Sequence, residues 1–178
     1  MKVQRASYAG FTLLETLIAL VVLSVGVLSL AAMLANGMIS MNNSQDSYIA
    51  QQKATEAIES IFTARDLAQT SWIQINNTSA GGIFLAGPQP LCDPGPDAIV
   101  GTTDDNCAIP DAIIMPGPDG ILGTGDDVRV PLSLFTRTIT ITPDPVTANL
   151  KDIVVVVTYT SGTFKRSYTV TALISQFS

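Results

Sequence analysis

The feature that most constrains this chain is an apolar stretch near its N-terminus, from Phe11 to Ala35, in which Glu15 is the one charged residue. As an α-helix rising about 1.5 Å per residue, the stretch would be roughly 37 Å long, enough to cross a bilayer core of about 30 Å. The short segment before it carries Lys2 and Arg5. A basic leader of this kind favours a cytoplasmic N-terminus. The stretch therefore predicts one membrane-inserted helix, with the rest of the chain exported.

Two simpler uses of an apolar N-terminal stretch have to be weighed against a functional span. A cleaved secretory signal has an apolar region of about 7–15 residues followed by a cleavage site, whereas this stretch is longer and passes into a polar helical pattern. A plain signal anchor explains the length but not Glu15. A carboxylate inside an apolar span costs on the order of 2.5–3.5 kcal/mol and is usually functional. Composition alone leaves the plain anchor and the functional span equally open.

The residues that open the apolar stretch form a recognisable motif. The sequence GFTLLE at residues 10–15 resembles the prepilin signature of type IV pilins and type II secretion pseudopilins. The resemblance implies that a prepilin peptidase cuts between Gly10 and Phe11 and that Phe11 is then N-methylated. It also implies that Glu15 neutralises the N-terminal amine of a neighbouring subunit during filament assembly. A buried carboxylate is tolerated when it is paired, which agrees with this role for Glu15.

The residues after the motif indicate which members of this family the chain resembles most. The sequence TLIALVVLSVGVLSLAAM is most similar to minor pilins of the PilV type, with the I subunit of type II secretion pseudopilins next. The close resemblance covers about residues 5–66. It implies a single-pass protein of the bacterial inner membrane that later enters a pilus or pseudopilus. The implied partners are other pilins or pseudopilins, the prepilin peptidase and the membrane.

Charge and composition exclude some functions. The net charge is −6, and an acidic exported domain argues against nucleic acid as a partner, because phosphate binding needs a basic patch. The chain has no histidine, which removes the commonest general base and zinc ligand. No pairing of a nucleophile with a base is visible in the sequence. An assembly subunit that requires no cofactor is therefore favoured over an enzyme.

Helical periodicity continues after the apolar stretch. Ala50, Ala54, Ala57, Ile58 and Ile61 fall on one helical face, which predicts a single helix from near Phe11 to about Arg65. The alternative is two helices separated near Asn42 and Asn43. The predicted organisation is a leader at 1–10, a membrane or filament-core helix at 11–35, its amphipathic continuation at 36–66 and a globular head at 67–178.

The predicted head contains an acidic region at residues 92–130. The frame PGPDxIxGTxDD occurs there twice, at residues 94–105 and 116–127. More than half of the chain's 15 acidic residues lie between Asp93 and Asp127, with no lysine or arginine among them. Concentrated carboxylates repel one another unless they are solvated or bridged by a cation.

Two interpretations of the repeated frame remain open. Ca²⁺ needs six to eight oxygen ligands, and glycine allows the sharp turns of a binding loop. One interpretation is therefore a Ca²⁺ site in each copy, with ligands from the repeated aspartates, and it makes the head a Ca²⁺-dependent adhesion module displayed on a pilin helix. The other is a pair of solvated turns whose aspartates cap backbone amides. The candidate metal ligands are Asp97, Asp104 and Asp105 in the first copy and Asp119, Asp126 and Asp127 in the second.

The two cysteines, Cys92 and Cys107, bracket the first copy. Such a pair in an exported domain usually forms a disulfide. A thiol metal site needs further ligands, and the chain has no histidine to supply them. A disulfide between Cys92 and Cys107 is therefore predicted.

The last third of the chain predicts antiparallel strands. Phe135, Arg137, Ile139 and Ile141 alternate with threonines, and residues 153–160 form a β-branched run. Ser161-Gly162 is the predicted two-residue turn into a third alternating strand. The predicted fold class is α+β, a pilin-like fold in which a long N-terminal helix packs on a β-meander at residues 134–175.

Overall fold

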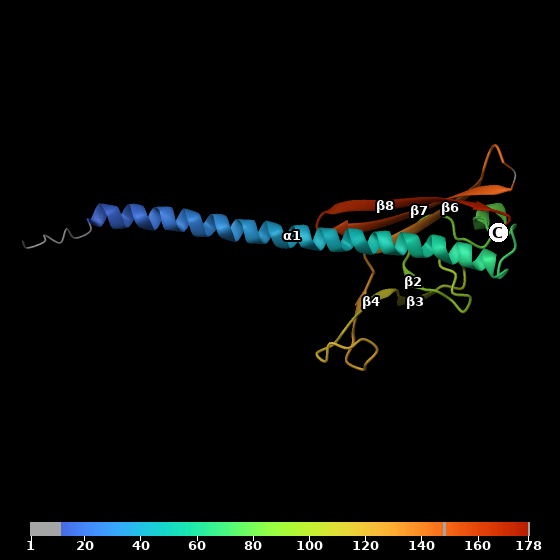
Figure 1. Cartoon of the computed structure of the whole chain (residues 1–178), viewed down its shortest axis with the longest axis horizontal. Helices are drawn as coiled ribbons and strands as arrows, with labels where there is room; N and C mark the ends of the chain where they lie inside the picture. The colour runs from blue at the N-terminus through green and yellow to red at the C-terminus, as the bar shows by residue number, and fades with distance from the viewer. Residues whose placement is uncertain (1–11, 148, 178) are drawn as a thin grey trace, which may run out of the picture. The chain divides into compact units, whose positions relative to one another are not determined.

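A computed structural model describes residues 12–147 and 149–177, which form one long helix, a short 3₁₀ turn and eight strands (Figure 1). The chain divides into two compact units, Met1–Asn43 and Ser44–Ser178, and we describe each by itself. The helix is α1 (Leu13–Asp66) and the 3₁₀ turn is η1 (Thr78–Ala80). The strands are β1 (Gln89–Pro90), β2 (Cys92–Asp93), β3 (Asn106–Pro110), β4 (Ala112–Met115), β5 (Val128–Pro131), β6 (Phe135–Pro143), β7 (Leu150–Ser161) and β8 (Phe164–Ser175).

The first unit is the apolar half of α1. Thr12 precedes the helix and accepts the first helical hydrogen bond, from Thr16 N to its carbonyl at 3.2 Å. Side chains from Leu13 to Asn42 are exposed, and the most apolar window of α1 has a mean hydropathy of 2.7. Among the described residues, α1 is the one helix long and apolar enough to cross a membrane. The prediction of one continuous helix through Asn42 and Asn43 is confirmed.

The second unit is built on a four-stranded antiparallel sheet with the order β1-β6-β7-β8. The predicted meander is therefore present as β6-β7-β8, and the two-residue strand β1 extends it. The predicted turn is wrong by one residue: Ser161 still pairs with Phe164, so Gly162 and Thr163 form the turn. Gly162 has a φ of 63°, a left-handed conformation that glycine adopts without steric cost.

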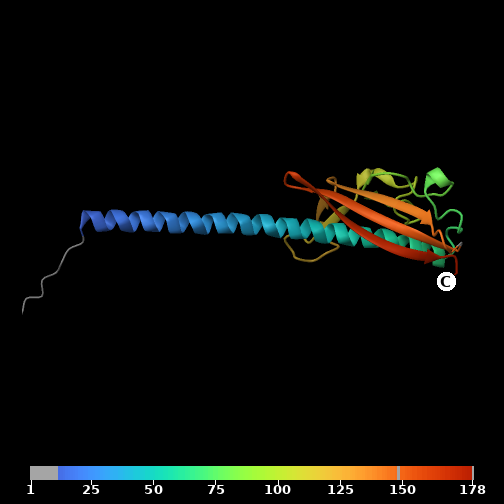
Figure 2. The same ribbon diagram turned by 90° about the horizontal axis from the view of Figure 1, so that it is seen from above.

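The core of the second unit lies between the sheet and the C-terminal part of α1, as Figure 2 shows. Small side chains allow the helix to approach the sheet closely, because Ala50, Ala54 and Ala57 are completely buried. The sheet contributes the inward-facing residues of β7, among them Ile153, Val155 and Val157, which are also fully buried. The long helix packed on an antiparallel sheet confirms the predicted α+β fold class.

The outer strands of the meander, β6 and β8, have different neighbours. At β6, strand β1 pairs with Thr136 and Arg137 only. Further along β6, the buried side chain of Asn77 takes the place of a strand, donating from Nδ2 to the carbonyl of Ile139 at 2.8 Å and accepting from the amide of Ile141 at 2.8 Å. Within the described residues, β8 has a strand partner on one side only.

Replacing Asn77 by alanine should destabilise the head by about 1–3 kcal/mol, because it leaves a buried amide and a buried carbonyl of β6 without partners. Thermal unfolding of the full chain in detergent measures the change. The matched control is Asn76→Ala, which removes a single exposed hydrogen bond to the carbonyl of Ile73. Equal melting temperatures for the two variants would contradict the proposed role of Asn77.

Candidate functional site

The predicted processing residues, Gly10 and Phe11, lie outside the described residues. Glu15 lies in the first turn of α1 and is exposed. Its backbone amide donates to the hydroxyl of Thr12 at 3.2 Å. Thr12 and Glu15 therefore occupy the two positions of a capping box, in which an acidic residue also interacts favourably with the helix dipole. The spacing T-x-x-E is the sequence signal that could have indicated this cap.

The two acidic loops share one internal hydrogen-bond pattern. In the first loop, Asp97 Oδ1 accepts from the amide of Ile99 at 2.9 Å, and Asp105 Oδ2 accepts from the amide of Gly101 at 2.8 Å. In the second loop, Asp119 Oδ1 accepts from the amide of Ile121 at 2.8 Å. Asp127 Oδ2 accepts from the amide of Gly123 at 2.7 Å. The aspartates thus cap backbone amides, as one of the two interpretations of the repeat expects.

A third contact is also repeated. The hydroxyl of Thr102 donates to Asp104 Oδ1 at 2.5 Å, and the hydroxyl of Thr124 donates to Asp126 Oδ1 at 2.6 Å. The hydrogen bond from Thr124, together with one from the amide of Asp119, lowers the pKa of Asp126. In the second loop Gly117 is required because a Cβ there would collide with the backbone and carboxylate of Asp126. The sequence repeat is therefore a structural repeat.

The two loops differ in their surroundings. In the first loop the apolar pair Ile99 and Val100 is buried in the core of the head. Burial also raises the pKa of Asp105, although hydrogen bonds from Gly101 and Thr102 and the charge of Arg137 oppose that rise. The second loop forms the tip of the β4–β5 hairpin, and its aspartates Asp119 and Asp126 are exposed.

The predicted metal ligands do not converge in this structure. Across residues 12–147 and 149–177, no three His, Cys, Asp or Glu side chains form a group that could hold a metal ion. The six candidate aspartates instead belong to the hydrogen-bonded turns described above. Calcium binding stays a prediction, to be tested on the protein itself.

The disulfide between Cys92 and Cys107 is present, with a Cα–Cα distance of 4.7 Å. It joins β2 to β3, whose pairing is interrupted by a register shift between Cys92 and Asp93. β3 is exposed along its whole length. The bond therefore closes the first acidic loop at a place where little apolar burial holds the strands together.

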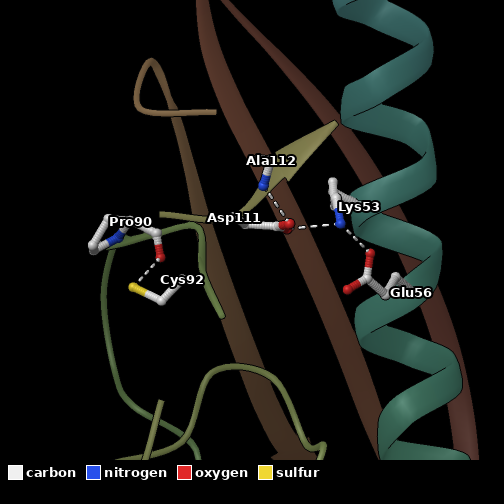
Figure 3. A network of polar contacts seen from close by, with 6 residues as sticks. All are labelled: Lys53, Glu56, Pro90, Cys92, Asp111 and Ala112. Atoms are coloured by element: carbon white, nitrogen blue, oxygen red, sulfur yellow. Dashed lines mark hydrogen bonds and ion pairs between the residues drawn. The ribbon is translucent and has the colours of Figure 1, made fainter. Parts of the chain in front are cut away.

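A partly buried polar network ties α1 to the start of β4 (Figure 3). The ammonium group of Lys53 lies 2.7 Å from a carboxylate oxygen of Asp111 and 2.7 Å from one of Glu56. Burial lowers the pKa of Lys53, but the hydrogen bonds and charges of Asp111 and Glu56 outweigh it and raise the pKa. Asp111 also accepts from the amide of Ala112, so this carboxylate fixes the start of β4 against the helix.

Arg137 lies on the buried face of β6 and is only 3% exposed. Burial lowers the pKa of its guanidinium group, and the negative charges of Glu56, Asp105 and Asp111 oppose that shift. Its side chain therefore balances three carboxylates from α1 and from the loop region. The alternation of apolar residues placed Arg137 on the inward face, but no sequence pattern indicated its partners, which come from distant parts of the chain.

Lys151 forms hydrogen bonds to the backbone of the segment that follows α1. Its ammonium group donates to the carbonyls of Trp72 and Ile75 at 2.7 and 2.8 Å and lies 4.3 Å from the centre of the Trp72 ring. Burial lowers the pKa of this lysine. Trp72 is half-buried and packs against the core.

Comparison with known proteins gives one match. Residues 5–31 match the family model described as the prokaryotic N-terminal methylation motif. No curated protein and no solved structure matches the chain. The matched residues include the GFTLLE motif and much of the apolar half of α1. The match supports a precursor of the type IV pilin or pseudopilin kind, with pilin-type processing, assembly with other pilins and association with a membrane.

Replacing both cysteines by serine should lower the free energy of unfolding by about 3 kcal/mol, the loop-closure entropy expected for a separation of 15 residues. Chemical denaturation of the full chain in detergent measures this loss, and the reduced wild-type chain should lose the same amount. Peptide mapping without reductant should recover Cys92 linked to Cys107. Free thiols in exported protein would contradict the bond.

The calcium prediction is tested by melting the full chain in millimolar Ca²⁺ and in chelator. An ion that binds the folded state stabilises it by RT ln(1 + [L]/Kd), so the prediction expects a higher melting temperature in Ca²⁺. Mg²⁺ should help less, because it demands tighter octahedral geometry. Asp126→Asn with Asp127→Asn should reduce the gain. Equal melting in Ca²⁺ and in chelator would assign the aspartates to capping alone.

Proposed function

We propose that this chain is a minor type IV pilin of the PilV kind, a structural subunit and not an enzyme. The prepilin peptidase removes residues 1–10 in the inner membrane, and the new N-terminal residue, Phe11, is methylated. The apolar half of α1 anchors the subunit until it enters a pilus or primes its assembly. The head at residues 67–178 is exported.

The observation that carries this proposal is the continuity of the motif with the helix. The methylation motif covers residues 5–31, and α1 runs without a break from Leu13 to Asp66. A secretory signal ends in a cleavage site after a short apolar region. Here the helix keeps its apolar half exposed and buries a face of small residues in the head. One element thus serves as both anchor and scaffold.

A type II secretion pseudopilin is the second candidate, because the same motif and helix support it equally. The two differ in the filament that contains the subunit. Deleting the gene for this chain and measuring surface pili and secreted enzymes separates them. A pilin mutant loses or shortens its pili, whereas a pseudopilin mutant retains its exported enzymes inside the envelope.

Processing is tested by intact-mass measurement of protein purified with the filaments. We expect a chain that begins at Phe11 and carries one added methyl group. A filament subunit that retains Met1 would overturn the proposal. Membrane-bound precursor from cells without the peptidase provides the reference mass.

Glu15 is tested with two substitutions, because it serves both as a cap residue and as a proposed partner for a neighbour's amine. Glu15→Gln keeps a capping-box residue type but removes the charge, and Glu15→Ala removes both. We expect both variants to insert into the membrane and both to be strongly depleted from filaments. Glu59→Gln, an exposed charge change elsewhere on α1, is the control. Normal incorporation of Glu15→Gln would show that the charge is not required.

A further inference from the structure

The two acidic loops share one sequence frame and one hydrogen-bond pattern, yet their apolar pairs have opposite surroundings. Ile99 and Val100 in the first loop are each 2% exposed, whereas Ile121 and Leu122 in the second are 60% and 62% exposed. The first loop therefore shows which kind of surface a loop with this frame packs against when its apolar pair is buried. The second loop presents the same chemistry to solvent.

The partner of the first loop combines an apolar surface with a cation. A Cβ added at Gly101 would meet the side chain of Ile139, so the loop backbone rests on the inner face of β6. The amide of Leu85 donates to the carbonyl of Gly101 at 2.8 Å. Arg137 attracts the carboxylate of Asp105. The first loop thus packs on an apolar strand that also carries an arginine, whose charge favours the ionised form of Asp105.

The second loop lacks both parts of such a partner in the single chain. None of its carboxylates forms an ion pair with another residue that the structure describes. We call residues 116–127 the acidic tip. Its exposed apolar pair and the exposed side chains of Asp119 and Asp126 indicate a contact surface for an apolar group that has a cation beside it.

This chain carries such a surface at the end of the β7–β8 hairpin, residues 162–166, which we call the basic turn. Phe164 is 70% exposed, and Lys165 and Arg166 beside it are exposed too. Neither cation forms an ion pair with another residue that the structure describes. The basic turn thus complements the acidic tip in charge, and both offer large apolar side chains.

The two surfaces lie at the same end of the head, on opposite sides of α1, as Figures 1 and 2 show. The hydroxyl of Ser161, the residue before the basic turn, donates to Asp46 of α1 at 2.9 Å, which fixes this end of the hairpin against the helix. A single chain therefore does not close the contact within itself. Copies placed side by side bring the acidic tip of one toward the basic turn of the next.

We propose that the acidic tip of one copy docks on the basic turn of a second copy of this chain. In this contact Ile121 and Leu122 lie against Phe164, and the exposed carboxylates of the tip face Lys165 and Arg166. The contact joins two different surfaces, so each copy keeps one surface free for a further copy, as in an open filament. Its place in a filament rests on the proposed function. The contact between copies does not depend on the proposed function, because it can also be measured on chains in the membrane.

The test is a disulfide cross-link between two full-length variants expressed together in membranes. Gly125→Cys marks the acidic tip, where an added Cβ meets nothing within 4 Å, and Thr163→Cys marks the basic turn. We expect a cross-linked dimer when both variants are present. The matched control pairs Gly125→Cys with Val146→Cys, which is 90% exposed and precedes the opposite end of β7. The parent chain, whose described cysteines are both in a disulfide, gives the background.

Two further variants test the chemistry of the contact. Lys165→Glu with Arg166→Glu should lower the dimer yield about fivefold or more, the factor that corresponds to losing one surface ion pair of about 1 kcal/mol. Added salt should lower it as well, because exposed charges are screened. Ile121→Ser with Leu122→Ser should lower the yield similarly, whereas Leu67→Ser, at an apolar side chain that is 65% exposed elsewhere, should not. Melting temperatures equal to that of the parent confirm that each variant is folded.

The dimer yield distinguishes this contact from chance collision and from a metal site. A dimer yield no higher than that of the Val146→Cys control overturns the proposal, as does a yield that the charge reversal leaves unchanged. Cross-linking that requires Ca²⁺ and survives the charge reversal also overturns it, because the acidic tip then serves a metal ion. If the chain is methylated at Phe11 and enters filaments but does not cross-link, the proposed function stands and the contact fails.

Discussion

The head depends on how closely α1 approaches the sheet. Ala50, Ala54 and Ala57 place almost no side-chain volume between the helix backbone and β7, so the branched side chains of Ile153 and Val155 fill the interface. A larger residue on this face would separate the two layers, and tightly packed interiors tolerate such changes poorly. The same approach brings Lys53 of α1 within reach of Asp111 and thereby fixes the loop region to the helix.

The charged residues inside the head follow from that packing. Arg137 and Lys151 lie on strands whose inward faces are otherwise apolar, and both are buried. A buried charge is costly unless it is paired or hydrogen-bonded. Lys151 donates to two backbone carbonyls. The Nη1 atom of Arg137 has no hydrogen-bond partner among the described residues, but the charges of Glu56, Asp105 and Asp111 favour its charged form. The first acidic loop is therefore part of the charge balance of the core, while the second, outside the core, is available for contacts with other molecules.

The division of roles along the chain agrees with an assembly subunit. The apolar half of α1 is suited to a membrane or a filament interior, and the other half belongs to the core of the head. At the start of the helix, Thr12 and Glu15 form a cap before any neighbour is bound. The head adds the disulfide, the polar network and the acidic tip.

Much of this architecture was determined by local sequence. The apolar stretch, the alanine face and the alternation along β6–β8 each repeat with the period of one secondary structure, so the helix, the strands and the inward position of Arg137 could be predicted. The repeated frame likewise predicted two similar loops, because its glycines and aspartates act within a few residues. Tertiary structure alone decided which loop is buried, that Asn77 covers the edge of β6, and that Lys53 pairs with Asp111. These contacts join residues far apart in the chain, and their formation depends on packing that no local pattern encodes.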